Sequence, residues 1–119
     1  MKTVLIVDDE PKIRAILAQF FESRGLRILT AETGREALSR LDEAAPDFLL
    51  LDIGMPDISG LEVLKTAKAR FPSVKVVMVT AFGDDQTIET AAQLGACDYI
   101  TKPFGLDERL WERTVLAAG

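Results

Sequence analysis

Short apolar segments alternate with longer segments of helical periodicity along this chain. The apolar segments have the length of strands and lie at Thr3–Val7, Arg27–Ala31, Phe48–Leu51, Lys75–Val79 and Asp98–Thr101. Strands that alternate with helices form repeated βαβ units, and such units build a largely parallel sheet. The sequence therefore predicts an α/β fold with a single doubly wound, five-stranded parallel sheet.

Three of these segments contain uninterrupted apolar runs, at Val4–Val7, Phe48–Leu51 and Val76–Val79. A parallel strand that is covered by helices on both faces has this composition, so these three strands are expected in the centre of the sheet. The second and fifth segments are less uniformly apolar and are expected at its edges. Right-handed crossovers then give the order 2-1-3-4-5, a flavodoxin-like (βα)5 arrangement in which the first and third strands are neighbours.

The first two helical segments carry recognisable boundaries. Pro11 suits the first turn of the first helix, and Gly25 suits its end. Thr33 and Glu36 have the spacing of a capping box at the start of the second helix, which Pro46 stops. The residues predicted to face inward are Ile13, Ile16, Leu17, Phe20 and Phe21 in the first helix and Ala37, Leu38 and Leu41 in the second.

Three further helices are predicted. The third spans about residues 61–71 and ends before a proline. Asp84 or Asp85 is expected to cap the fourth, which stops at Gly95, and the fifth lies near Leu106–Ala118. Their predicted inner faces are Leu61, Leu64, Ala67 and Phe71, then Ile88, Ala91, Ala92 and Leu94, then Leu106, Leu110, a partly buried Trp111 and Val115.

Composition limits the classes of protein to which the chain can belong. Its 119 residues, 48% of them hydrophobic, can bury one ordinary core, so we expect one domain over residues 1–119. The net charge of −5 disfavours nonspecific attraction to nucleic acid or to an anionic membrane. The single Cys97 excludes an internal disulfide and is expected to be a small packing residue. Without a secretory signal or an apolar stretch of about 20 residues, the sequence predicts a cytoplasmic protein whose partners are proteins.

The chain contains no histidine. This excludes a Ser-His-Asp triad, a histidine-containing zinc site and an internal phosphohistidine. Any phosphoryl group that moves through this protein must therefore arrive from another molecule.

Four of the five predicted strands end in residues suited to magnesium or to a phosphoryl group, namely Asp8 with Asp9, Asp52, Thr80 and Lys102. The carboxyl ends of parallel strands open onto one crevice, so these side chains are expected to meet. Two like charges about 4 Å apart repel by about 4 kcal/mol at an effective dielectric of about 20, so clustered carboxylates favour a bound cation. Magnesium prefers hard oxygen ligands and is often shared between carboxylates and a phosphate. The sequence therefore predicts a magnesium site here.

Asp52 is the expected nucleophile, because it would end a central strand beside the acidic pair and carboxylates form acyl phosphates. Phosphoryl transfer depends mainly on positioning and charge stabilisation, which magnesium, Lys102, the Thr80 hydroxyl and the Ala81 N–H would provide. Each residue alone has an ordinary role as a cap, a turn, a strand end or a surface charge. Their joint placement at strand ends indicates a site.

These residues belong to four segments that together resemble the receiver domains of two-component response regulators, such as the chemotaxis response regulator. The resemblance extends from about Lys2 to Ala117, and four such segments in this order are highly specific. The segments are Ile6-Val7-Asp8-Asp9-Glu10, Leu51-Asp52-Ile53-Gly54-Met55-Pro56-Asp57-Ile58-Ser59-Gly60, Val79-Thr80-Ala81 and Gly95-Ala96-Cys97-Asp98-Tyr99-Ile100-Thr101-Lys102-Pro103-Phe104.

The resemblance implies roles for the residues of the crevice. Asp52 would accept a phosphoryl group from the phosphohistidine of a sensor histidine kinase or phosphotransfer protein, by self-catalysed transfer rather than as a turnover enzyme. Asp9, Asp52 and the Gly54 carbonyl would bind Mg2+ directly, and Asp8 would bind it through water. Lys102 would pair with the phosphoryl group, and its bond to Pro103 would be cis.

The resemblance also implies a switch. After phosphorylation the Thr80 hydroxyl would move toward the phosphoryl oxygens and Tyr99 would turn inward, which would change the face formed by the fourth helix, fifth strand and fifth helix. That face would control a downstream protein or output domain, and a phosphorylation-dependent homodimer stays open. At the site, Gly54 would leave open space and Phe82 would slow attack by water.

Other classes of function predict different features. A flavodoxin-like electron carrier would need a phosphate-cradling loop where this chain has Asp8-Asp9-Glu10-Pro11, and a magnesium-dependent phosphatase usually has Asp-x-Asp after its first strand. A receiver that acts as a phosphate-independent interaction module is the strongest alternative. No output domain is recognisable in this chain, which is expected to be a stand-alone receiver or part of a longer regulator.

Overall fold

Five parallel strands form one sheet in the order β2-β1-β3-β4-β5. This order and pairing confirm the predicted doubly wound arrangement. β4 extends one residue beyond its predicted end and so includes Thr80. The computed structural model describes residues 1–104 and residue 111, and its strands are β1 (Thr3–Val7), β2 (Arg27–Ala31), β3 (Phe48–Leu51), β4 (Lys75–Thr80) and β5 (Asp98–Thr101).

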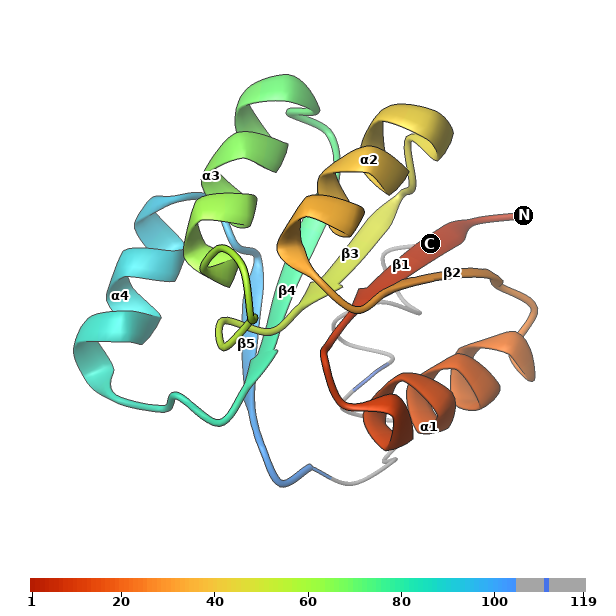
Figure 1. Cartoon of the computed structure of the whole chain (residues 1–119), viewed down its shortest axis with the longest axis horizontal. Helices are drawn as coiled ribbons and strands as arrows, with labels where there is room; N and C mark the ends of the chain where they lie inside the picture. The colour runs from red at the N-terminus through yellow and green to blue at the C-terminus, as the bar shows by residue number, and fades with distance from the viewer. Residues whose placement is uncertain (105–110, 112–119) are drawn as a thin grey trace.

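Helices pack on both faces of the sheet (Figure 1). Side chains of α2, α3 and α4 join one core cluster with Leu5 and Leu49, whereas α1 joins a second with Ile6 and Leu50. None of the helices in the described ranges has the length and apolar character needed to cross a bilayer. The described helices are α1 (Pro11–Glu22), α2 (Gly34–Ala44), α3 (Gly60–Arg70) and α4 (Asp85–Gln93).

The predicted fifth helix, with Leu106, Leu110 and Val115, lies outside the described residues. Trp111 is described, and it is fully buried rather than partly buried as predicted. Its indole packs edge-on against Phe21 and Phe104, with ring centroids 5.3 and 5.6 Å away. Aromatic contacts of this kind favour complete burial of the ring on the α1 side of the sheet.

Four of the predicted signals mark helix boundaries in the structure. Pro11 occupies the first turn of α1, and Gly25, which follows this helix, has a φ of 86°, a conformation that glycine adopts at little cost. Thr33 Oγ1 accepts the N–H of Glu36 at 3.1 Å, which caps α2. Asp84 caps α4 by accepting the N–H of Thr87 at 3.0 Å.

Three residues predicted to pack inward lie at the surface. Ile16 is 43% exposed, and Ala92 and Cys97 are also exposed. Ile16 and Ala92 flank the apolar stripes of their helices, and the sheet buries only the centre of each stripe. The backbone N–H of Cys97 donates to the Val76 carbonyl at 2.8 Å just before β5 begins, which leaves the thiol exposed.

The buried face of α3 also differs from the prediction. Leu61 and Phe71 are only half-buried, and Leu38 of α2 is likewise half-buried. The residues of α3 that are fully buried have the spacing i, i+3, i+4 and i+7. The stripe begins at a glycine, which has no apolar side chain to mark it in the sequence, so the prediction began one residue late. Its members are Gly60, Val63, Leu64 and Ala67.

Gly60 allows the start of α3 to approach the backbone at the end of β3. A Cβ at residue 60 would lie 1.9 Å from the Asp52 carbonyl oxygen and 2.7 Å from the Ile53 Cα. We expect Gly60→Ala to lower the free energy of unfolding by about 3 kcal/mol, because backbone must move to accommodate the methyl group. Urea unfolding followed by circular dichroism measures this loss.

Gly54→Ala is the matched control, because its Cβ would meet a side chain, the Phe82 ring, at 3.3 Å. An exposed ring shifts by a few tenths of an ångström more easily than buried backbone does. Equal losses of stability in the two variants would contradict the role assigned to Gly60.

Candidate functional site

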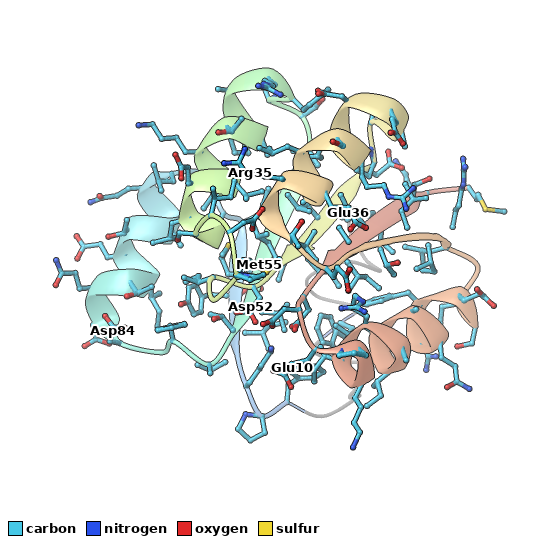
Figure 2. All side chains as sticks on the ribbon, in the orientation of Figure 1. Glu10, Arg35, Glu36, Asp52, Met55 and Asp84 are labelled. Atoms are coloured by element: carbon cyan, nitrogen blue, oxygen red, sulfur yellow. The ribbon has the colours of Figure 1, made fainter. Side chains whose placement is uncertain are left out.

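The strand ends bring the predicted site residues to one edge of the sheet. Val7 of β1 pairs with Leu51 of β3, so the residues that follow them, Asp8 and Asp52, are neighbours. The Asp52 N–H donates to the Val7 carbonyl at 3.1 Å, which fixes the backbone at this point. Figure 2 shows Asp52 beside the end of β3 and Glu10 near the start of α1, at this edge of the sheet.

Lys102 reaches the same place from the end of β5. Its N–H donates to the Thr80 carbonyl at 2.8 Å, which holds the residue after β5 against the end of β4. Its Nζ lies 2.7 Å from Asp8 Oδ2, 3.0 Å from Asp52 Oδ2 and 3.3 Å from Glu10 Oε1. One ammonium therefore contacts three carboxylates, which come from two segments that are far apart in the sequence.

Burial makes these charges depend on one another. The side chains of Lys102, Asp8 and Asp52 are only 12%, 3% and 8% exposed. Burial raises the pKa of Asp8 above its ordinary value, although hydrogen bonds from Lys102 and the Glu10 N–H act in the opposite direction. Burial lowers the pKa of Lys102, but its hydrogen bonds to Asp8 and Asp52 outweigh that effect and raise it overall. The ammonium is therefore held in its charged form.

The oxygen ligands best placed for a metal belong to Asp8, Asp9 and Glu10. One carboxylate oxygen from each lies within 4.8 Å of the others. Hard carboxylate oxygens of this kind suit magnesium, so the donor set fits the predicted ion. Of the other predicted ligands, Asp52 directs Oδ2 to Lys102, and its Oδ1 accepts the N–H of Gly54 at 3.2 Å.

Glu10 was not predicted as a site residue. It lies beside the acidic pair at the start of α1, contacts Lys102 and shares the cluster with Asp8 and Asp9. Its position directly after two aspartates at a strand end is a signal that sequence reasoning had available.

Phe82 connects the residues predicted to form the switch. Its N–H donates to Thr80 Oγ1 at 3.4 Å, and its carbonyl accepts the Tyr99 hydroxyl. The Phe82 ring is 51% exposed and lies 3.3 Å from the position that a Gly54 Cβ would occupy. Thr80 is fully buried, while Ala81 is exposed beside it. The ring therefore partly closes the space beside Gly54, and the backbone of one residue joins Thr80 to Tyr99.

A cavity of about 580 Å³ opens beside this cluster. It is mostly apolar, and its walls include Ile13, Ile16, Ala81 and Phe104, with Glu10 and Lys102 at the charged side. The Lys102–Pro103 peptide bond next to it is cis, as the resemblance to receiver domains implies. The exposed Ile16 of α1 thus borders the acidic site rather than the protein core.

Comparisons with known proteins agree with this geometry. The family description of the response regulator receiver domain matches residues 4–113. The chain is 43% identical over 105 residues to the DNA-binding transcriptional regulator NtrC of Salmonella typhimurium, covering 88% of this chain and 22% of that protein. It is 41% identical over 110 residues to the transcriptional regulatory protein KdpE of Mycobacterium tuberculosis, covering 92% and 48%. The chain thus spans less than half the length of these relatives.

Solved structures of receiver domains share the fold. A CheY-like receiver domain protein from Methanospirillum hungatei superposes with a TM-score of 0.90 and 32% identity, covering 95% of this chain and 90% of the other. The BeF3-activated receiver domain of DrrB gives a TM-score of 0.86 and 34% identity, covering 95% and 93%. With the family match, the sheet order and the residues at the strand ends, the chain belongs to the response regulator receiver domain family.

Proposed function

We propose that this receiver domain accepts a phosphoryl group on Asp52 from the phosphohistidine of a sensor kinase or phosphotransfer protein. The observation that carries the proposal is the position of Asp52 directly after a central strand, with its side chain 8% exposed and the Lys102 ammonium 3.0 Å from its Oδ2. Residues 1–119 contain no histidine, so the phosphohistidine of the donor lies outside them. Residues 1–119 act in this proposal as one input domain.

The transfer itself needs few groups. A carboxylate oxygen of Asp52 attacks the phosphorus, a P–O bond forms, and the P–N bond of the donor breaks with its electron pair leaving on the imidazole. Lys102 stabilises the negative charge that spreads over the equatorial oxygens, and the Thr80 hydroxyl and Ala81 N–H donate hydrogen bonds to them. The domain catalyses its own modification and slow hydrolysis, and it turns over no separate substrate.

Asp8 and Asp9 would hold Mg2+, joined by Asp52 and the Gly54 carbonyl, as in the receivers that this chain resembles. When bound, the ion supplies charge neutralisation at the phosphoryl oxygens. In the resting arrangement Glu10 also contacts Lys102, with its Oε1 3.3 Å from the ammonium. Together with Asp8, it keeps Lys102 beside the nucleophile before a phosphoryl group arrives.

The output depends on Thr80 and Tyr99. In this arrangement both side chains are hydrogen-bonded to the Phe82 backbone. A phosphoryl group that attracts the Thr80 hydroxyl breaks the hydrogen bond between Thr80 and the Phe82 N–H. Tyr99 then turns inward and alters the face formed by α4, β5 and the segment predicted as the fifth helix. That face controls an output domain or a separate protein, to the extent that phosphorylation favours the active arrangement.

Exposure to a small phosphodonor such as acetyl phosphate tests the proposal. We expect intact-mass spectrometry to show one added phosphoryl group with Mg2+ present and none after chelation. Peptide mapping should locate the group on the peptide that contains Asp52. If neither the small donor nor a phosphorylated kinase forms the adduct, the result would favour the phosphate-independent interaction module.

Phe82 is expected to prolong the phosphorylated state. Its ring borders Gly54, so Phe82→Ala opens the site to water and should raise the rate of dephosphorylation several-fold. Phe82→Tyr keeps the ring and serves as the control. The rate is measured as loss of the adduct mass after the donor is removed. Equal lifetimes of the alanine variant and the unmodified chain would contradict a shielding role.

A further inference from the structure

Asp57 binds the first turn of α2 from a distant part of the chain. Its Oδ1 accepts the N–H of Gly34 at 2.9 Å, and its Oδ2 accepts the N–H of Arg35, also at 2.9 Å. The Arg35 Nε lies 3.9 Å from the same Oδ2. Figure 2 labels Arg35 and Glu36 in this turn. A residue of the β3–α3 loop thus caps a helix that begins more than twenty residues earlier.

The cap is complete only when Asp57 is present. The first N–H groups of a helix have no partner within the helix. Thr33 accepts the Glu36 N–H, which leaves those of Gly34 and Arg35, and Asp57 binds both. A carboxylate at this end of a helix also interacts favourably with the helix dipole. Partial burial raises the pKa of Asp57, but these backbone hydrogen bonds outweigh it and lower the pKa overall.

Side-chain packing joins the same two segments. Gly34 is buried, and a Cβ at this residue would lie 2.4 Å from Cγ1 of Ile58 and 3.1 Å from Cγ2 of Val63. The start of α2 is therefore in close contact with the residue that follows Asp57. The loop is held to α2 both by hydrogen bonds and by apolar contact.

The other end of the loop is fixed at the phosphoacceptor. The Gly54 N–H donates to Asp52 Oδ1 at 3.2 Å. The N–H groups of Met55 and Gly60 both donate to the Ile53 carbonyl at 2.9 Å. The segment between Asp52 and Gly60 is thus a short closed loop. Asp57 attaches this loop to α2, and Gly54 lies in the sequence between Asp57 and the attachment at Ile53.

We propose that Asp57 is a positioning residue for the phosphoacceptor site, and that it couples the first turn of α2 to the segment Asp52–Gly54. The expected effect of Asp57 on Mg2+ binding rests on the proposed function. Because coupling between two sites is reciprocal, an event at Asp52–Gly54 changes the stability of the α2 turn by the same free energy.

Amide hydrogen exchange of the full chain tests the coupling without any phosphoryl transfer. In Asp57→Ala, exchange should be faster at Gly34 and Arg35, and also at Gly54, Met55 and Gly60. Asp57→Asn keeps one acceptor oxygen and should lie between the alanine variant and the unmodified chain. Faster exchange confined to Gly34 and Arg35 would overturn the proposal, because Asp57 would then be only a local helix cap.

Asp42→Ala is the matched control. Asp42 lies on α2 and pairs with Arg70 of α3 at 3.5 Å, so it also joins these two helices. Among the described residues it forms no hydrogen bond or ion pair with the loop. We expect its exchange rates at Gly54, Met55 and Gly60 to equal those of the unmodified chain. An equal acceleration in both variants would show that general loosening of α2 against α3 explains the effect, and the proposal would fail.

Magnesium provides the functional measurement. Groups that orient metal ligands typically contribute about 10-fold or more to affinity, so Asp57→Ala should raise the half-saturating Mg2+ concentration for phosphorylation by about 10-fold. The rate at saturating Mg2+ should change much less. Mg2+ should also slow exchange at Gly34 and Arg35 in the unmodified chain but not in Asp57→Ala. An unchanged Mg2+ requirement in Asp57→Ala would contradict the positioning role. If the unmodified chain forms no adduct, the proposed function is contradicted instead. The exchange experiment then decides the role of Asp57.

Discussion

Replacing Asp52 with asparagine is expected to abolish formation of the phosphoryl adduct. The amide has no anionic oxygen to attack phosphorus, while its carbonyl oxygen keeps the hydrogen bond that Asp52 Oδ1 accepts from Gly54. Lys102 still contacts Asp8 at 2.7 Å and Glu10 at 3.3 Å, so two ion pairs of the site survive. The variant should therefore fold and bind its partners in the unphosphorylated form. Intact-mass spectrometry after incubation with acetyl phosphate and Mg2+ measures the loss.

Asp47→Asn is the appropriate control, because Asp47 and Asp52 flank the two ends of β3. Asp47 lies at the amino end, where its Oδ2 accepts the N–H of Thr3 at 2.8 Å. The control variant removes the same charge at the other end of the same strand and should be phosphorylated normally. An adduct of normal yield in Asp52→Asn would mean that another residue is the acceptor and would refute the proposed function.

Lys102→Met should lower the free energy of unfolding by about 4 kcal/mol at neutral pH and without Mg2+. Removal of one partner from a buried ion pair leaves charges without compensation, which typically costs this amount. Here the side chains of Asp8 and Asp52 remain buried and lose their shared ammonium. Methionine has a similar length, so packing changes little. Urea unfolding measures the loss, and Lys12→Met, at an exposed residue of α1, provides the control.

The loss in Lys102→Met should depend on pH in a defined direction. The pKa of Asp8 is already raised by burial, and it rises further once the ammonium is absent. The folded state then binds more protons than the unfolded state between the ordinary value of 3.8 and the raised pKa. Stability therefore falls as pH rises through this window, and the variant should regain stability at about pH 4 relative to about pH 8. A deficit independent of pH would contradict the assignment of the loss to unpaired carboxylates.

The sheet and much of the site were predictable because their signals are local. Strands covered on both faces must be apolar throughout, which marked Val4–Val7, Phe48–Leu51 and Val76–Val79 as the central strands. In a parallel sheet of the predicted order, the residues that follow the strands lie together at the edge formed by the carboxyl ends. The contacts of Lys102 with Asp8 and Asp52 confirm that these residues come together.

The features that were missed depend on contacts between distant segments. Asp57 has no periodicity or spacing relative to Gly34, so its role as a cap for α2 is visible only when the loop and helix are placed together. The apolar stripe of α3 begins at Gly60, whose burial reflects the proximity of the Asp52 backbone rather than its own hydrophobicity. The charge of Glu10 is evident in the sequence, but its contact with Lys102 depends on the path of the chain between β1 and α1.

The close approach of Gly60 to Asp52 has a consequence for engineered chimaeras of this domain. A segment exchanged between two receivers at residues 53–59 would retain its own sequence but acquire new anchors. The recipient would need a glycine at the first position of α3, and the grafted loop would need a carboxylate that reaches the first N–H groups of the recipient's α2. A loop moved between receivers should therefore be transferred together with the two segments that it contacts, the first turn of α2 and the start of α3.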